Sequence, residues 1–116
     1  MDNFHELYTS FVKTHSEVDY SNKNSVKKGN KAVTKMLTLI ATSKKSDPVK
    51  TQTYLEELLN QKECEVWSAT HLLENFPNSG KQKEALTIIE TIASGDSAEA
   101  MGFQFWLKDW KSKNVL

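Results

Sequence analysis

Hydrophobic residues recur at helical spacing along most of the chain. Near the start, in residues 3–18, they occupy positions i, i+3, i+4, i+7 and i+8, which lie on one face of a helix. The side chains on this face are Phe4, Leu7, Tyr8, Phe11, Val12 and, at its end, His15. One histidine on such a stripe is typical of a side chain at the edge of a core. The pattern therefore predicts an amphipathic helix over residues 3–18.

A second helix is expected after the polar segment 19–25. Its N-cap would be Asn24 or Ser25, and it would run to about Thr42. Its apolar side comprises Val33, Met36, Leu37 and Ile40.

Pro48 suits the first turn of a third helix, with Ser46 or Asp47 as its N-cap. The apolar side of this helix comprises Tyr54, Leu55, Leu58 and Leu59. Glu56 and Glu57 are expected to point away from that side.

Two shorter amphipathic helices, over residues 63–76 and 79–94, are joined by a turn with Pro77 and Gly80. One stripe of the first comprises Val66, Ala69, Leu72, Leu73 and Phe76, within an arc of about 120°. A nearly opposite stripe comprises Trp67, His71 and Glu74. The apolar positions of the second are Ala85, Ile88, Ile89 and Ile92, and Gly95 is expected to end it as a left-handed C′ residue.

A sixth helix is expected over residues 98–111, capped by Asp96 or Ser97. It is apolar on more than one side, whereas a terminal helix of a stack normally shows a polar outer face. The excess indicates contact with the tail, which ends in Val115 and Leu116, or with a partner.

These patterns predict an all-α fold in a single domain over residues 1–116. Four glycines and two prolines supply too few turn residues for a β-sandwich. Paired helices joined by short turns are the unit of helical-repeat proteins. We therefore expect six helices in three antiparallel hairpins, arranged as a short right-handed α-solenoid.

The formal net charge of zero conceals a strong asymmetry. Residues 13–50 contain nine lysines and three acidic residues, a net charge of +6. Residues 51–109 contain ten acidic residues and four lysines, a net charge of −6. All fifteen basic residues are lysine. Because arginine makes the bidentate contacts that read base edges, its absence argues against sequence-specific nucleic-acid recognition.

The lysines of the second helix allow two interpretations. They are Lys23, Lys27, Lys28, Lys31 and Lys35. Such a run is commonly a solvated helix face, and a polyanion site is the alternative. No aromatic residue lies between Tyr20 and Tyr54 to stack on bases, as single-strand binders usually require.

Motifs for catalysis, metals and cofactors are not found in the sequence. Cys64 is the sole cysteine, which excludes an intrachain disulfide and suits a reducing cytoplasm. It lies two helical turns, about 10 Å, from His71, too far for a thiolate–imidazole pair. His71 and Glu74 have i, i+3 spacing but lack the second motif of a di-metal bundle. The N-terminus does not resemble a signal peptide. We expect a cytoplasmic protein that is not an enzyme and has no cofactor.

The second stripe of residues 63–76 has two interpretations. Trp67 packs against a neighbouring hairpin, or it anchors a partner-contact patch. In the second case acidic residues, Glu65 among them, surround an aromatic anchor, an arrangement common at interfaces. The partner-binding residues predicted on this basis are Glu56, Glu57, Glu63, Trp67, His71 and Glu74.

The second half of the chain carries three matching features in order. They are Glu65-Val66-Trp67-x-Ala69-Thr70-His71-Leu72-Leu73 followed by Pro77, then Ala85-Leu86-x-Ile88-Ile89-x-x-Ile92-Ala93, and finally Leu107-x-x-Trp110-Lys111. Over residues 49–111 the chain resembles a family of small bacterial proteins of unknown function built from HEAT-like helical hairpins. The resemblance implies an α-solenoid fragment and assigns no activity.

Proteins of this size and type are often encoded beside bacterial toxins, where they resemble immunity proteins. The resulting hypothesis is a protein-binding module that neutralises a toxin domain, for example a basic nuclease. The acidic half would attract such a partner electrostatically. The alternative is a nucleic-acid-associated HEAT-like module that binds through the lysine-rich second helix.

Overall fold

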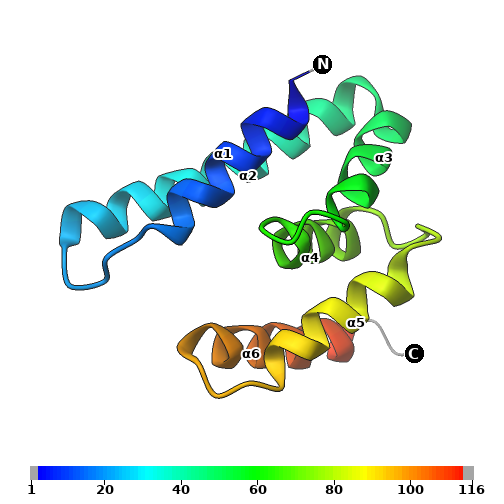
Figure 1. Ribbon diagram of the computed structural model, residues 1–116. Helices are drawn as coiled ribbons and strands as arrows, with labels where there is room; N and C mark the ends of the chain where they lie inside the picture. The colour runs from blue at the N-terminus through cyan, green and yellow to red at the C-terminus, as the bar shows by residue number, and fades with distance from the viewer. Residues whose placement is uncertain (1–2, 114–116) are drawn as a thin grey trace.

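The computed structural model describes residues 3–113, and within this range the chain forms six α-helices and no β-strand (Figure 1). The helices are α1 (Phe4–Ser16), α2 (Lys23–Ser46), α3 (Pro48–Leu58), α4 (Glu65–Asn75), α5 (Gln82–Ala93) and α6 (Ala98–Lys113). The predicted all-α class is confirmed. The largest difference in bounds is at α2, which continues one turn beyond the predicted end at Thr42.

Side-chain caps fix the start of several helices. The Asp47 carboxylate accepts a hydrogen bond from the Lys50 backbone N–H at 3.1 Å, directly before Pro48 in the first turn of α3. Ser97 Oγ accepts one from the Ala100 N–H at 3.0 Å. One of the two caps predicted for each of these helices is therefore confirmed.

The cap of α2 lies earlier than the sequence pattern predicts. Asn22 has an extended backbone, and its side-chain oxygen accepts hydrogen bonds from the N–H groups of Asn24 and Ser25 at 2.9 and 3.3 Å. The residues predicted as the cap are thus the donors to it. Ser25 instead bonds the preceding loop, since its hydroxyl accepts from the Asp19 N–H at 2.8 Å.

The prediction that Gly95 ends α5 in a left-handed conformation is wrong. Ser94 is the C-cap and keeps a right-handed helical conformation, and the Gly95 N–H donates to the Ile92 carbonyl at 3.2 Å. Among residues 3–113 no glycine has a positive φ. The chain leaves α5 through a tight right-handed turn, so Gly95 is not required for its left-handed freedom.

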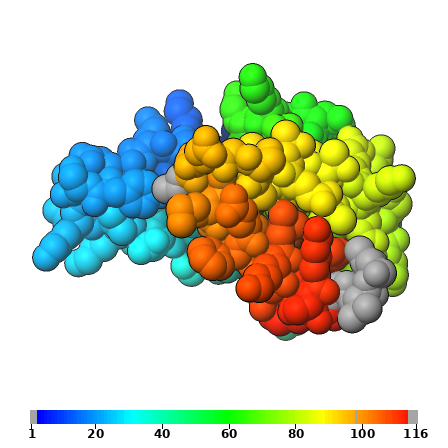
Figure 2. Space-filling view, turned by 90° about the horizontal axis from the view of Figure 1, so that it is seen from below, coloured from blue at the N-terminus to red at the C-terminus, as the bar shows by residue number. Residues whose placement is uncertain are grey.

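Helices that follow one another in the chain pack together, with α1 against α2 and α5 against both α4 and α6. Figure 1 shows the α1–α2 pair at one end and the α5–α6 pair at the other, with α3 and α4 between them. Viewed from below, α5 (yellow) and α6 (orange to red) cover much of one face (Figure 2). Helix α4 therefore lies in the middle of the molecule.

One hydrophobic cluster runs through all six helices. It contains the complete apolar stripe predicted for α4, namely Val66, Ala69, Leu72, Leu73 and Phe76. Leu37 of α2 was expected on the apolar side but is 48% exposed. The buried face of α2 is centred on Ala32 and Met36, and the 100° turn per residue places Leu37 at its edge.

Gly29 of α2 permits a close approach to the end of α1. A Cβ atom built on Gly29 would overlap Cγ2 of Val18, whereas one built on Gly102 of α6 would meet nothing within 4 Å. Both glycines lie inside helices. They form a matched pair in which the helix-propensity gain is the same and the steric surroundings differ.

We expect Gly102→Ala to raise the free energy of unfolding by roughly 0.5–1 kcal/mol, because alanine loses less backbone entropy in a helix. The free energy of unfolding of Gly29→Ala should be about 1–3 kcal/mol lower than that of Gly102→Ala. This difference is the usual cost of overpacking, since the branched Val18 side chain has little freedom to move. Urea unfolding monitored by circular dichroism measures both variants. Equal stabilisation by the two substitutions would contradict the close approach.

Candidate functional site

The second stripe of α4 connects this helix to α1 and α6. The centroid of the Trp67 ring lies 4.9 Å from that of His15 on α1, and the two rings meet edge to face. The centroid of the His71 ring lies 6.0 Å from that of Trp67. The Glu74 carboxylate accepts a hydrogen bond from the Trp106 indole N–H of α6 at 3.1 Å. The three stripe residues therefore make contacts within the chain, and Trp67 is half-buried against the core.

His71 lies inside the protein. It is 3% exposed, and its Nδ1 forms a 2.5 Å hydrogen bond with the hydroxyl of Tyr8 on α1. Burial lowers the pKa of His71 to about 4 and raises the pKa of Tyr8 well above its ordinary value. Both groups are therefore neutral near pH 7. The structure places His71 beneath the predicted contact surface, because Tyr8 covers it.

Cys64 is also buried, at the start of α4. Its Sγ lies 3.6 Å from the Thr9 hydroxyl of α1, and burial raises the pKa of the thiol. The neutral thiol is the favoured form in such surroundings, and it is a poor nucleophile. Together with Tyr8 and His71, it forms a neutral polar seam between α1 and α4.

Two of the predicted docking carboxylates link helices to each other. Glu56 accepts a hydrogen bond from the buried Ser79 hydroxyl at 2.6 Å, which ties α3 to the turn before α5. It also accepts from the Gln52 amide at 3.1 Å. Glu57 lies 3.2 Å from Nε2 of His5 on α1. These carboxylates orient α3 against its neighbours.

Glu63 and Glu74 each line a surface depression, and the two depressions are separate. Glu63 borders one of about 460 Å³ beside α1. The other residues that line it are Thr9, Val12, Lys13 and Ser16. Its wall is largely one face of α1, and Glu63 supplies an exposed carboxylate at the edge.

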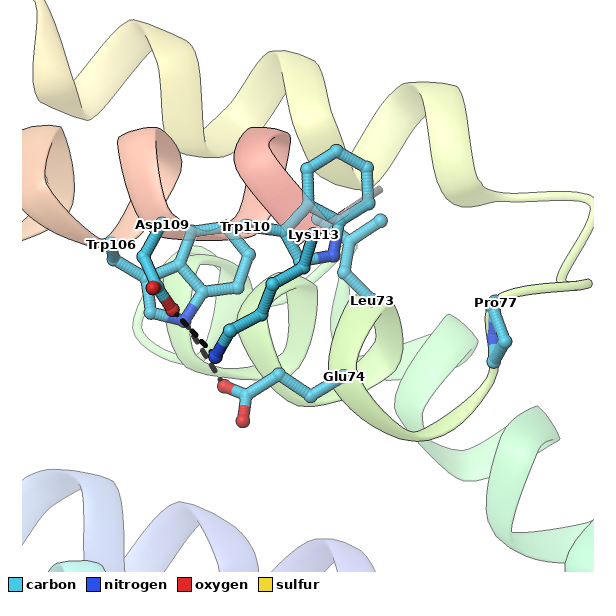
Figure 3. Close-up of a pocket in the computed structure, with 7 residues that line it drawn as sticks. All are labelled: Leu73, Glu74, Pro77, Trp106, Asp109, Trp110 and Lys113. Carbon is cyan, nitrogen blue, oxygen red and sulfur yellow. Dashed lines mark hydrogen bonds and ion pairs between the residues drawn. The ribbon is translucent and has the colours of Figure 1, made fainter. Parts of the chain in front are cut away.

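Glu74 belongs to a depression of about 280 Å³ where α4 meets α6, which we call the α4–α6 depression (Figure 3). Its lining residues are Leu73, Glu74, Pro77, Trp106, Asp109, Trp110 and Lys113. The Trp106 and Trp110 rings are stacked, with centroids 6.1 Å apart and planes 10° apart. Two carboxylates and two indoles thus meet at one place on the surface.

Glu74 was among the residues predicted to bind a partner, whereas Trp106, Asp109 and Trp110 were not. These three residues stand at i, i+3 and i+4 of one helix, so the pattern places them on one face. That spacing was a usable signal. The contribution of α4 to the same place depends on the packing of α4 and α6, which the pattern does not specify.

Another side of α6, next to the one that carries Asp109, bears the exposed side chains of Met101 and Phe105, 55% and 70% exposed. The tail residues proposed to cover the apolar excess of this helix, Val115 and Leu116, lie outside the described residues. Trp106 and Leu107 account for part of the excess, since they pack towards α4 and the core.

Comparison with known proteins gives no assignment, because no family model, curated protein or solved structure matches the chain. Across residues 3–113, no three His, Cys, Asp or Glu side chains are grouped as a metal site requires. None of the helices described combines the length and the apolar character needed to cross a membrane.

The burial of His71 makes the stability of the protein depend on pH. The unfolded chain protonates this histidine near its ordinary pKa of 6.5, and the native protein does so near 4. Between these values the unfolded state binds more protons, so the His71 contribution is complete above about pH 6.5 and decreases as the pH falls towards 4.

We expect the loss of unfolding free energy between about pH 7.5 and about pH 5 to be smaller in His71→Gln than in the wild type, since the limiting slope of one such group is about 1.4 kcal/mol per pH unit. Urea unfolding at the two pH values measures this difference, which is independent of any uniform destabilisation. His15→Gln is the control that removes another histidine and should retain the pH dependence. An unchanged dependence in His71→Gln would show that His71 is not held neutral.

Proposed function

We propose that the chain is a non-catalytic, cytoplasmic protein-binding module with a basic protein as its partner. The most concrete form is an immunity protein that neutralises a toxin domain, such as a nuclease. The proposal includes the finer architecture, in which antiparallel hairpins of the HEAT-like type form a short right-handed solenoid. The observation that carries it is the α4–α6 depression, where carboxylates border stacked indoles.

This combination is the chemistry of an interface for a basic partner. Tryptophan is over-represented among the anchor residues of interfaces, which polar groups commonly surround. Glu74 and Asp109 supply the polar groups, and residues 51–109 carry a net charge of −6. Carboxylates at the rim speed the encounter with a basic surface, and the aromatic centre slows dissociation.

A toxin that acts on nucleic acid needs a basic surface to bind phosphates. A protein that covers this surface with an acidic region prevents access without any reaction of its own. The predicted docking residues fit this role unequally. Glu63 and Glu74 are exposed at depressions, Trp67 is half-buried, and the remaining ones make contacts that hold the helices together.

The proposed toxin is to be sought among the products of the neighbouring genes. We expect the double variant Glu74→Lys/Asp109→Lys to lose protection in cells that express this toxin, and to bind it at least about tenfold more weakly, because charge reversal replaces attraction by repulsion. Growth rescue and surface plasmon resonance give the two readouts. Circular dichroism checks that the variant is folded.

The matched control is Glu84→Lys/Glu90→Lys on α5, which makes the same change in net charge outside the lining of the depression. It should retain rescue. An equal loss of rescue in both double variants would show that the effect depends on net charge alone. Full rescue by Glu74→Lys/Asp109→Lys would refute docking at this surface.

A second candidate function is supported by α2. This helix contains seven lysines and no acidic residue. Lys23, Lys27, Lys31 and Lys35 recur every four residues and are exposed, so they form one ridge. In the described part of the chain, no α2 lysine makes an ion pair with a carboxylate.

Such a ridge has an energetic cost. Like charges at i, i+4 destabilise a helix by roughly 0.2–0.5 kcal/mol per pair, and a bound polyanion would relieve this repulsion. Phosphate contacts made by lysine provide affinity without base specificity. The second candidate is therefore a sequence-independent association with nucleic acid along α2.

If this candidate is correct, the protein should bind a short DNA duplex at about 50 mM salt, with an affinity that falls steeply as salt increases. Lys27→Gln/Lys31→Gln should reduce the slope of log K against log salt by about two. Fluorescence anisotropy measures this slope. Lys62→Gln/Lys83→Gln is the control outside α2, and equal effects of the two double variants would reject the ridge.

A further inference from the structure

The α4–α6 depression already holds a cation from its own chain. Lys113, in the last turn of α6, lines the depression, and its Nζ lies 3.0 Å from the Asp109 carboxylate. Figure 3 shows the Lys113 side chain extended across the depression, with its ammonium on the side where the Glu74 carboxylate lies. An internal ammonium thus reveals the kind of group that this surface accommodates.

The Lys113 contact is an exposed one. The side chains of Lys113 and Asp109 are 70% and 65% exposed, and both lie on the same helix at i, i+4 spacing. Ion pairs of this kind contribute little, since water screens them and the lysine side chain loses entropy. A competing cation could therefore replace Lys113 at small cost.

The other lining residues offer a carboxylate and an aromatic surface, which suit a cationic side chain with an apolar stem. The Trp106 N–H holds the Glu74 carboxylate at 3.1 Å, and a carboxylate can accept further hydrogen bonds. The half-buried Trp106 indole offers aromatic surface to the stem and to the charge, and the buried Trp110 ring stacks behind it. About 280 Å³ lies below the range of roughly 300–1,000 Å³ for drug-sized ligands and suits one side chain.

We propose that the α4–α6 depression receives a single arginine or lysine side chain of the basic protein partner, and that Lys113 is an internal competitor which this side chain displaces. The inference rests on the proposed function for the existence of a basic partner. Charge complementarity argues for it, because two carboxylates from different helices converge where the chain supplies one weakly held ammonium.

Removal of Lys113 should therefore strengthen binding at this site. Lys111→Ala is a matched control. Lys111 lies in the same last turn of α6 and pairs with a carboxylate, Glu90 of α5, at 3.5 Å, but it does not line the depression. Both substitutions remove one positive charge, so their effects on long-range electrostatics are similar. A difference in peptide affinity between the two variants therefore indicates that the peptide displaces the Lys113 ammonium.

The probe is the blocked peptide Ac-Gly-Arg-Gly-NH2, compared with the peptide that has neutral citrulline in place of arginine. The titration follows the tryptophan indole N–H signals of the ¹⁵N-labelled protein, assigned with Trp106→Phe and Trp67→Phe. We expect the arginine peptide to shift the Trp106 signal more than the Trp67 signal. Lys113→Ala should tighten binding by about two- to fivefold relative to Lys111→Ala, and Glu74→Gln should weaken it.

Equal affinities of Lys113→Ala and Lys111→Ala would overturn the proposal, as would equal binding of the arginine and citrulline peptides. The titration contains no toxin, so its result is separate from that of the rescue assay. A selective arginine response with failed rescue supports the site and rejects the toxin as partner. Successful rescue without a Trp106 response rejects the site and leaves the proposed function in place.

Discussion

The hydrogen bond between Tyr8 and His71 is the contact on which the arrangement of the helices depends. It joins α1 to α4 across 63 positions of sequence, inside the protein. A buried imidazole without a hydrogen-bond partner would lower the stability of the fold. Helix α1 therefore has to lie where the Tyr8 hydroxyl reaches His71 on α4. Among the described residues, no buried side-chain nitrogen or oxygen is left without a hydrogen bond. The position of α1 in turn places α2 along the edge of the molecule.

Helix α4 thus divides its two faces between packing and connection. The leucine-containing stripe enters the core, and the other stripe reaches α1 through His71 and α6 through Glu74. Two carboxylates that were predicted to belong to a docking patch, Glu56 and Glu57, instead connect α3 to the turn before α5 and to α1. The two surfaces proposed for a partner, the α4–α6 depression and the lysine ridge of α2, lie in the acidic and the basic part of the chain.

Sequence patterns predicted the helices well because apolar residues recur at helical spacing in each of them, and they predicted Asp47 and Ser97 because a cap is a local hydrogen bond. Asn22 was missed because the choice among neighbouring polar residues depends on which one is extended. The burial of His71 was missed because Tyr8 is far away in sequence. Trp106 and Asp109 share a helix face that the sequence displays, but Glu74 joins them through packing of α6 on α4.

The chain order of the helix contacts has a consequence for how the protein folds. Most helices pack on their immediate neighbour, so their contacts form after short loop closures and such folds form quickly. The contact of α1 with α4 must wait for a longer closure, with its larger entropic cost. We therefore expect the contact between α1 and α4 to form after the contacts between chain neighbours. When the protein opens locally, α1 should separate from α4 while α4, α5 and α6 remain together, and hydrogen exchange in native conditions should then be faster in α1 than in these three helices.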